Sequence, residues 1–391
     1  MKKRILIIGL IVSCLVLVAL GAGVQANWLR PTANSFELKT ETWQPFLETL
    51  FLLEENFYSE EGLDEKALME EAIRGLLRAT EDPYARYLDE DDYQIETSDR
   101  IEGEFSGLGI VVAIKDDWLT VISPYKGTPA DRAGIQAGDV ILEIDGEPTR
   151  GMSLDRAVKR LRGKRGTEVT LTIQREGVED PLEITVVRDI IKIKSVEYEI
   201  LSDEIGVLRI LEFHGRTAEE AQTALSELWR QGVEGIVVDL RSNPGGLLTT
   251  AILTSGMFVP RGETLLIIEY KSGEREFISN SLDPIWNKPV VVLIDQGTAS
   301  GAEIMAGVLR LKGVLLIGEK SFGKGVVQQV FPLSHGGGVI FTVSEYYLAD
   351  GSDINGEGLV PDLIVETEEE QMKKAVQELE RLLDETRAMA Q

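Results

Sequence analysis

The sequence predicts a mixed α/β protein that is built from more than one folding unit. Apolar residues recur at helical spacing from Thr42 to Leu88, short β-rich runs follow between residues 101 and 189, and strands alternate with helices from Glu199 onward. Such alternation is typical of α/β layer folds, in which sites form at the ends of strands. With 391 residues, the chain is long enough for two or three domains.

The first residues have the pattern of an export signal or a membrane anchor. The basic stretch "MKKR" precedes an apolar run of 20 residues, which is long enough to span a membrane at about 1.5 Å per residue. "VQA" at residues 24–26 resembles a signal-peptidase site, whereas the length of the run favours an uncleaved anchor. Residues 1–26 are therefore expected to be a signal peptide or an anchor, and the protein is expected to be exported.

Helical segments are expected at both ends of the remaining chain. Residues 27–100 form a helical region that either covers the core or pairs with a second copy in a homodimer. Residues 366–391 contain a charged amphipathic helix, which we expect to be solvated.

Residues 101–189 form a β-rich module with one helix between residues 153 and 163. The stretches "SGLGI" and "GTPADRAGIQAGDVILEIDGEP" (residues 127–148) resemble the PDZ domain, and the resemblance spans the module. In that family, consecutive N–H groups of the loop hold a terminal carboxylate while the peptide adds to the sheet edge. The resemblance assigns the loop to Ser106, Gly107, Leu108, Gly109 and Ile110. A spacer that binds no peptide is the alternative.

Residues 190–365 contain a serine at a junction between a strand and a helix. In "DQGTASGAEIMAG", Ser300 follows the apolar run that ends at Asp295, and a helix beginning there points free N–H groups outward. Ser300 is either a helix cap, with Glu303 completing a capping box, or a nucleophile beside an oxyanion site. Because Asp239 also follows an apolar strand, the two loops are expected to border one crevice.

A serine nucleophile needs a proton acceptor, for which the two histidines are poorly suited. His214 ends a strand and His335 lies in a glycine-rich turn, so each is expected to be a surface or turn residue. Lys324, between two glycines in "SFGKGVVQQV", is a better candidate because burial can lower the pKa of a lysine. In an extended segment, Gln328 would lie on the same face and could orient the amine.

Composition excludes several other classes of function. The net charge of −26 makes nucleic acid an unfavourable partner. Cys14 is the single cysteine and there are two histidines, so intramolecular disulfides, thiolate metal sites and multi-histidine metal centres are not expected. We expect no metal or organic cofactor.

Five motifs in order, "DPYARYL", "DLRSNPGG", "TASGAE", "GEKSFGKGVVQ" and "GLVPDLIV", resemble those of the carboxy-terminal processing peptidases, also called tail-specific proteases. The resemblance covers nearly all of the chain after its N-terminal segment and implies a protease core with crotonase-like layers. It assigns Ser300 as the nucleophile, Lys324 as the general base and Gln328 as the residue that positions the lysine. The implied oxyanion donors are the N–H of Gly301 and that of either Gly245 or Gly246.

The resemblance therefore implies an exported serine endopeptidase of the bacterial cell envelope, either membrane-anchored or secreted. It would cut proteins and peptides with free C-termini near those ends, while the PDZ domain captures the tail or gates the active site. A non-catalytic, PDZ-type peptide-binding adaptor on a protease-like fold is the alternative. A thioester-acting enzyme of the crotonase type is a weaker one, since the sequence shows no acyl-CoA site.

Overall fold

The structure is a computed structural model, which describes residues 40–58, 62–99, 103–115, 117–125, 127–152, 154–192, 194–334 and 336–389. The chain divides into two units, residues 1–72 and residues 73–391. The predicted signal or anchor lies outside the described residues. Within the described ranges, no helix is both long and apolar enough to cross a membrane.

The N-terminal helical region is shorter than its apolar periodicity predicts. It contains α2 (Thr40–Asn56) and α3 (Glu65–Arg78), and the residues that follow α3 are not helical as far as Leu88. Pro83 disfavours helix in the residue before it, and β1 (Arg86–Leu88) pairs antiparallel with a strand of the protease core. Two short helical elements come next, α4 (Glu90–Gln94) and the π-helix η1 (Ile95–Asp99).

The PDZ module has a sheet and a hydrophobic core of its own. Its strands run in the order β3-β4-β5-β7-β8, so β3 is an edge strand, and β6 pairs with β5. The first and last strands of the module in sequence, β2 and β9, pair antiparallel with each other. The bounds of its elements are β2 (Glu104–Gly107), β3 (Ile110–Lys115), β4 (Trp118–Pro124), α6 (Pro129–Arg132), β5 (Val140–Ile144), β6 (Glu147–Pro148), α7 (Leu154–Leu161), β7 (Glu168–Gln174), β8 (Leu182–Val187) and β9 (Asp189–Lys192).

A six-stranded sheet forms the centre of the protease core. Its order is β10-β11-β12-β15-β16-β19, and every pair is parallel except β10 with β11. The central strands are runs of valine, isoleucine and leucine, as expected for strands that are buried on both faces. Their bounds are β10 (Val196–Ile200), β11 (Ile205–Ile210), β12 (Gly235–Asp239), β15 (Val290–Ile294), β16 (Leu315–Gly318) and β19 (Leu363–Ile364).

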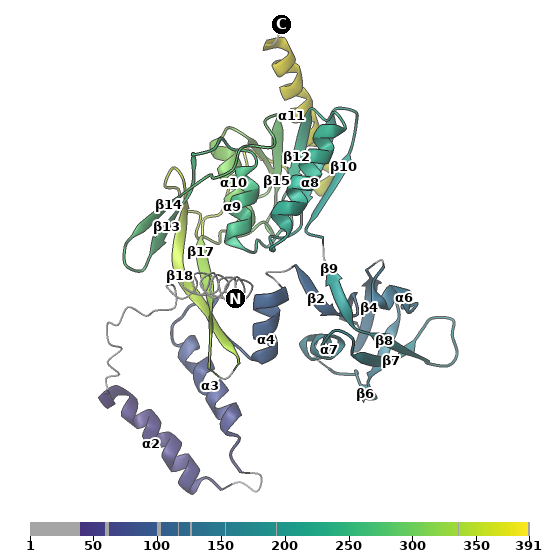
Figure 1. The fold of residues 1–391 in the computed structure, drawn as a ribbon, viewed down its shortest axis with the longest axis vertical. Helices are drawn as coiled ribbons and strands as arrows, with labels where there is room; N and C mark the ends of the chain where they lie inside the picture. The colour runs from purple at the N-terminus through teal and green to yellow at the C-terminus, as the bar shows by residue number, and fades with distance from the viewer. Residues whose placement is uncertain are drawn as a thin grey trace, which may run out of the picture. The chain divides into compact units, whose positions relative to one another are not determined.

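Helices cover both faces of this sheet (Figure 1). The helices α8 (Thr217–Arg230), α9 (Leu248–Gly256) and α10 (Gly301–Leu311) pack on one face. The other face is covered by α11 (Glu368–Met389), whose Leu379 is fully buried. The expectation of a solvated C-terminal helix is therefore wrong for one side of α11, because that side completes the core.

A second sheet carries the loop that contains Lys324. It is built around β18, which pairs with β17 along that strand's whole length and also pairs with β1 and β13. The bounds of its remaining strands are β13 (Thr264–Tyr270), β14 (Arg275–Ser279), β17 (Val326–Pro332) and β18 (Gly338–Leu348). Because Lys324 lies just before β17, this sheet fixes the position of the loop that contains Lys324.

Candidate active site

Ser300 lies in a strained turn between β15 and α10. Its backbone has φ +53° and ψ −117°, and positive φ is rare for residues other than glycine. Since α10 begins at Gly301, the N–H groups of its first turn have no acceptor within the helix. The turn therefore places Ser300 directly before the N–H of Gly301 at the start of α10.

The loops that follow β12 and β15 are in contact, as predicted from the apolar runs that precede them. The two strands are parallel neighbours, so their carboxyl ends meet at one edge of the sheet. The backbone N–H of Ser242 donates to Asp295 at 2.8 Å, and the N–H of Ala299 donates to the carbonyl of Asn243 at 3.0 Å. These bonds hold the "NPGG" turn against the turn of Ser300.

Gly245 is the closest part of that turn to Ser300. A Cβ atom on Gly245, which has φ +93°, would lie 2.7 Å from the Cβ of Ser300 and 2.8 Å from the nitrogen of Gly301. The N–H of Gly245 donates to Asn243 Oδ1 at 2.9 Å, so it is already engaged and does not fit the expected role of an oxyanion donor. Of the two glycines, Gly246 is the candidate that remains.

Glu303 joins the turn of Ser300 to the loop of Lys324. This buried carboxylate uses Oε2 to accept the backbone N–H groups of Ser300 at 2.8 Å and Lys324 at 2.9 Å. Its Oε1 accepts Ser321 Oγ at 2.5 Å and the N–H of Gly323 at 2.7 Å. The bond from Ser300 is the one expected of a capping box, but the other three come from a loop about 20 residues further along.

Tyr346 joins the same two residues through their carbonyl groups. Its hydroxyl donates to the carbonyl oxygen of Lys324 and lies 3.3 Å from that of Ser300. Burial, followed by the negative charge of Glu303, raises the pKa of Tyr346 well above its ordinary value, so the hydroxyl keeps its proton. We call Glu303 and Tyr346 the backbone clamp, because together they bind the main chains of Ser300 and Lys324.

The amine of Lys324 lies over an aromatic ring. Its Nζ is 4.4 Å from the ring centroid of Tyr84, within the range of a cation–π contact. Burial raises the pKa of Tyr84, and the charges of Asp82 and Glu303 raise it further. The "DPYARYL" motif therefore supplies the surface on which the lysine side chain rests.

Asp82 holds that aromatic residue in place. Its carboxylate accepts the N–H of Tyr84 at 2.9 Å and the N–H of Thr342 at 2.7 Å. Burial alone would raise the pKa of Asp82, but these hydrogen bonds and the charge of Lys324 hold it below the ordinary value. Asp82 thus stays ionised and fixes the turn of Tyr84 against β18.

Gln328 belongs to the same hydrogen-bond chain. Its Nε2 donates to Thr342 Oγ1 at 3.2 Å, and that hydroxyl lies 3.2 Å from Asp82 Oδ1. The strand-alternation argument that put Gln328 on the face of Lys324 is wrong in its premise, because β17 begins after Lys324 and its pairing with β18 shifts register between Val327 and Gln328. The positioning role of Gln328 stays a prediction.

The two histidines differ in what the structure shows. His214 lies in a turn as expected, but it is buried rather than on the surface, and its Nδ1 accepts the N–H of Arg216 at 3.2 Å. His335 lies outside the described residues. Within the ranges that the structure describes, no group of three or more His, Cys, Asp or Glu side chains could hold a metal ion.

The predicted carboxylate-binding loop lies at the start of the PDZ sheet. Ser106 and Gly107 end β2, and Ile110 begins β3, the edge strand to which a peptide would add. Gly109 has φ +75°, which favours glycine. The side chain of Leu108 is buried in the PDZ core, and the place of Leu108 in the carboxylate-binding loop stays a prediction.

Comparison with known proteins identifies the family. The family description "Peptidase family S41" matches residues 204–365, and "PDZ domain" matches residues 120–175. The "Carboxy-terminal-processing protease" of Bartonella bacilliformis (strain ATCC 35685 / KC583 / Herrer 020/F12,63) is 41% identical over 309 residues, which are 78% of this chain and 70% of that protein. The chain belongs to peptidase family S41. This S41 peptidase is thus a serine-type peptidase that contains a PDZ domain.

Two further similarities agree with this assignment. The "Carboxy-terminal processing protease CtpA" of Bacillus subtilis (strain 168) is 38% identical to the S41 peptidase over 304 residues, or 78% of this chain and 65% of that protein. The solved structure of a photosystem II D1 C-terminal processing protease has a TM-score of 0.51 at 31% identity, covering 83% of this chain and 87% of that one. Both the sequence and the fold of this peptidase therefore resemble those of proteases named for C-terminal processing.

Proposed function

We propose that this S41 peptidase cleaves protein substrates near their C-termini through an acyl-enzyme intermediate on Ser300. Lys324 accepts the proton of Ser300 Oγ as the oxygen attacks the substrate carbonyl carbon, and it returns that proton to the leaving amine when the C–N bond breaks. Water then hydrolyses the ester. The N–H groups of Gly301 and Gly246 are the proposed donors to the oxyanion, each worth about 3 kcal/mol in such sites.

The backbone clamp is the observation that carries this proposal. Ser300 and Lys324 are held by one carboxylate at their N–H groups and by one hydroxyl at their carbonyls. A catalytic pair needs such fixed geometry, since a displacement of about 1 Å can cost on the order of 100-fold in rate. A protein that only bound peptides would have no need to fix a strained serine against a lysine.

We further propose that the PDZ domain binds the C-terminal carboxylate of the substrate. The edge strand β3 lies beside α7, which is the arrangement that lets an extended peptide add to the sheet. Lys159 of α7 pairs with Asp89 at 2.8 Å and with Asp92 at 3.2 Å in the segment that follows β1. The helix beside the proposed peptide-binding edge thus contacts the chain just after β1, whereas Tyr84 lies just before β1. This short connection offers a route for gating.

A free carboxylate is expected to increase cleavage of a matched peptide. Removing the negative charge by C-terminal amidation should lower kcat/KM by about 10-fold or more, since a charge-assisted contact is worth about 1.5–3 kcal/mol. Steady-state kinetics and mass-spectrometric mapping of cut sites on acid and amide forms measure the effect. If amidation raises KM and leaves kcat unchanged, the PDZ domain delivers substrate; if amidation also lowers kcat, the domain gates the active site. Equal kcat and KM for the acid and amide peptides would contradict a role in tail recognition.

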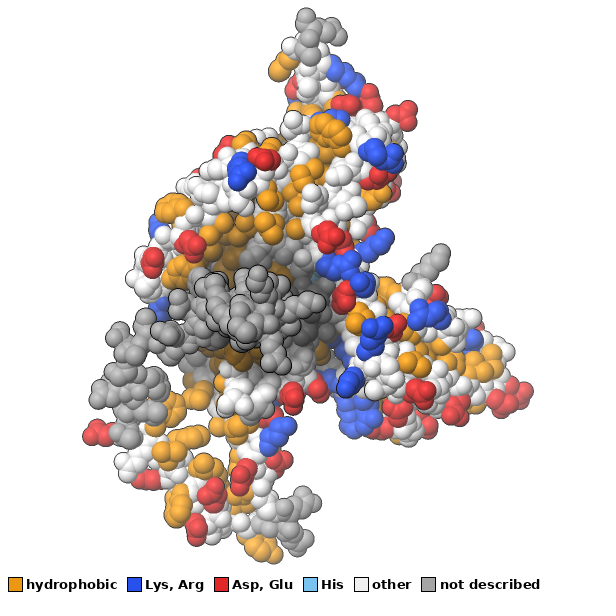
Figure 2. Space-filling model, viewed as in Figure 1, with side chains coloured by type: hydrophobic (Ala, Val, Ile, Leu, Met, Phe, Trp, Pro, Cys, Tyr) orange, Lys and Arg blue, Asp and Glu red, His pale blue; other side chains and the backbone are white. Residues whose placement is uncertain are grey.

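We propose that α2 forms a homodimer contact. Large apolar side chains on this helix are exposed, and they gather over α2 in Figure 2; they are Phe46, Leu47, Leu50, Phe51 and Leu52. Clustered exposed apolar residues mark interaction surfaces. The charged residues of α2 are all acidic, which disfavours anionic lipid and favours a protein partner.

Substituting Phe51→Glu is expected to convert a dimer to a monomer, because it places a charge in the proposed apolar contact. Phe277→Glu on β14 is the matched control, since the two phenylalanines are 60% and 62% exposed. Sedimentation or light scattering of both variants beside the native protein measures the mass. A native protein that stays monomeric at tens of micromolar, or an equal effect of the control, would contradict the contact.

A further inference from the structure

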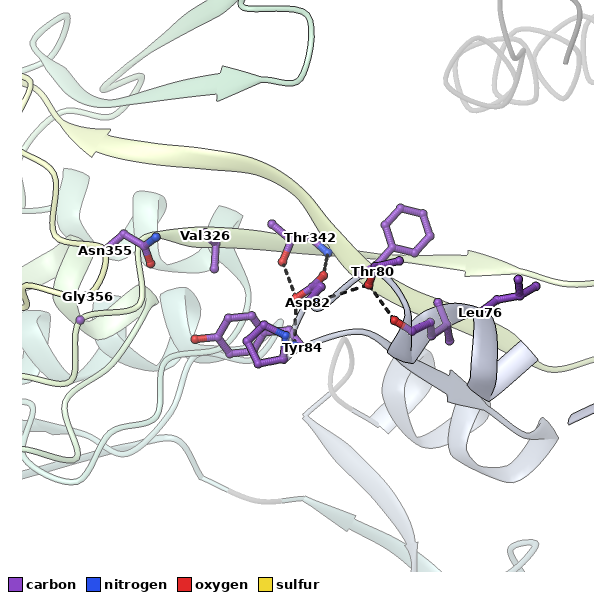
Figure 3. Close-up of a pocket in the computed structure, with 12 residues that line it drawn as sticks. Leu76, Thr80, Asp82, Tyr84, Val326, Thr342, Asn355 and Gly356 are labelled. Carbon is purple, nitrogen blue, oxygen red and sulfur yellow. Dashed lines mark hydrogen bonds between the residues drawn. The ribbon is translucent and has the colours of Figure 1, made fainter. Parts of the chain in front are cut away.

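A cavity of about 810 Å³ opens beside the loop of Lys324 (Figure 3). Its size lies within the range of about 300–1,000 Å³ that is typical of ligand pockets. The end of α3, the turn before β1, and strands β17 and β18 form its walls. Five of the twelve residues that line it have apolar side chains: Leu76, Leu77, Pro83, Val326 and Phe341.

The cavity borders the loop of Lys324 through two of its lining residues. Tyr84 lines it, and the ring of Tyr84 lies under the amine of Lys324. Gly323, which precedes that lysine in the chain, also lines it and donates its N–H to Glu303 of the backbone clamp. A peptide bond placed at Ser300 would therefore have a neighbouring residue within reach of the cavity.

Several polar groups in the cavity wall have protein partners. Asp82 accepts bonds from Thr342 and Tyr84, Thr80 Oγ1 donates to the carbonyl of Leu77 at 2.7 Å, and Asn355 accepts the N–H of Gly325 at 3.2 Å. An apolar group entering the cavity leaves these bonds intact. An acidic group would lose water and face the negative charge of Asp82.

We propose that this cavity is a specificity subsite that accepts an apolar side chain of the substrate near the scissile bond and rejects acidic side chains. The inference rests on the proposed peptidase function and deepens it, because it names the side-chain class that the site selects. It predicts that one position of the substrate, next to the cut, shows this preference.

Leu76→Lys tests the subsite by adding a positive charge to its wall. Leu76 is 49% exposed on α3 and takes no part in the backbone clamp, so the fold should tolerate lysine. Leu201→Lys, at a residue that is 44% exposed and outside the cavity, is the matched control. Peptides carrying Leu or Glu at each of the three positions on either side of the cut are compared by kcat/KM.

At one position, the native protein and the Leu201→Lys control should prefer Leu over Glu by about 100-fold, whereas Leu76→Lys should reduce this preference to about 10-fold or less. Preferences at the other positions should stay within about 2-fold, given that the new charge is confined to one wall. An unchanged preference at every position in Leu76→Lys, or an equal change in the control, would overturn the subsite while peptide cleavage persists. Failure of the native protein to cut any peptide would count against the proposed function itself.

Discussion

Ser300→Ala and Lys324→Ala are each expected to lower peptide hydrolysis by about 10⁴–10⁶-fold, because a nucleophile and its base act as a unit. The fold should survive both changes. Ser300→Ala removes only the hydroxyl, and Lys324→Ala loses a contact with Tyr84 worth about 0.5–1 kcal/mol. Fluorogenic peptide assays give the rates, and thermal denaturation shows whether each variant is folded.

Labelling with a fluorophosphonate probe separates loss of chemistry from loss of structure. The native protein should be labelled at Ser300, the Ser300→Ala variant should not, and Lys324→Ala should be labelled far more slowly. Lys271→Ala, which changes an exposed lysine between β13 and β14, is the control and should keep full activity. Substantial turnover by a folded variant at either residue would refute the assignment of Ser300 and Lys324.

Glu303→Gln is expected to damage both stability and activity. An amide has one acceptor oxygen, so it cannot accept all four of the hydrogen bonds that the carboxylate receives. Leaving buried donors without partners costs about 1–3 kcal/mol each, so the free energy of unfolding should fall by about 2–5 kcal/mol. The loosened geometry should lower kcat/KM by on the order of 100-fold in the fraction that stays folded.

Glu219→Gln is a close control for this change. Glu219 occupies the third position of α8, as Glu303 does in α10, but it is exposed. Its replacement should alter stability by no more than about 0.5 kcal/mol and leave the rate unchanged. Denaturant unfolding and the rate of fluorophosphonate labelling measure the two effects, and near-native labelling of Glu303→Gln would show that the backbone clamp is dispensable for reactivity.

The sequence was sufficient to predict the α/β core and the PDZ module, and it also supplied Ser300 and Lys324 as the proposed catalytic pair. These predictions depend on local patterns: the apolar strand before Ser300, the glycines around Lys324 and the alternation of strands and helices. The capping relation between Ser300 and Glu303 was also visible, because the two residues are three positions apart.

The rest of the site could not be predicted because its contacts join distant segments. Glu303 binds the loop of Lys324, and Asp82 binds Thr342 at a separation of 260 residues. Sequence reasoning missed Tyr346 altogether and used Asp82 and Tyr84 only as letters of a family motif. The register shift next to Gln328 likewise leaves no mark in the alternation of residue types.

The backbone clamp binds peptide groups rather than the reactive side chains. Glu303 and Tyr346 contact the N–H and carbonyl groups of Ser300 and Lys324, so these contacts are unaffected by removal of a hydroxyl or an amine. A catalytically inactive variant should then keep the fold of the native protein. Ser300→Ala is consequently suited to serve as a substrate trap, holding natural targets long enough for them to be isolated and named.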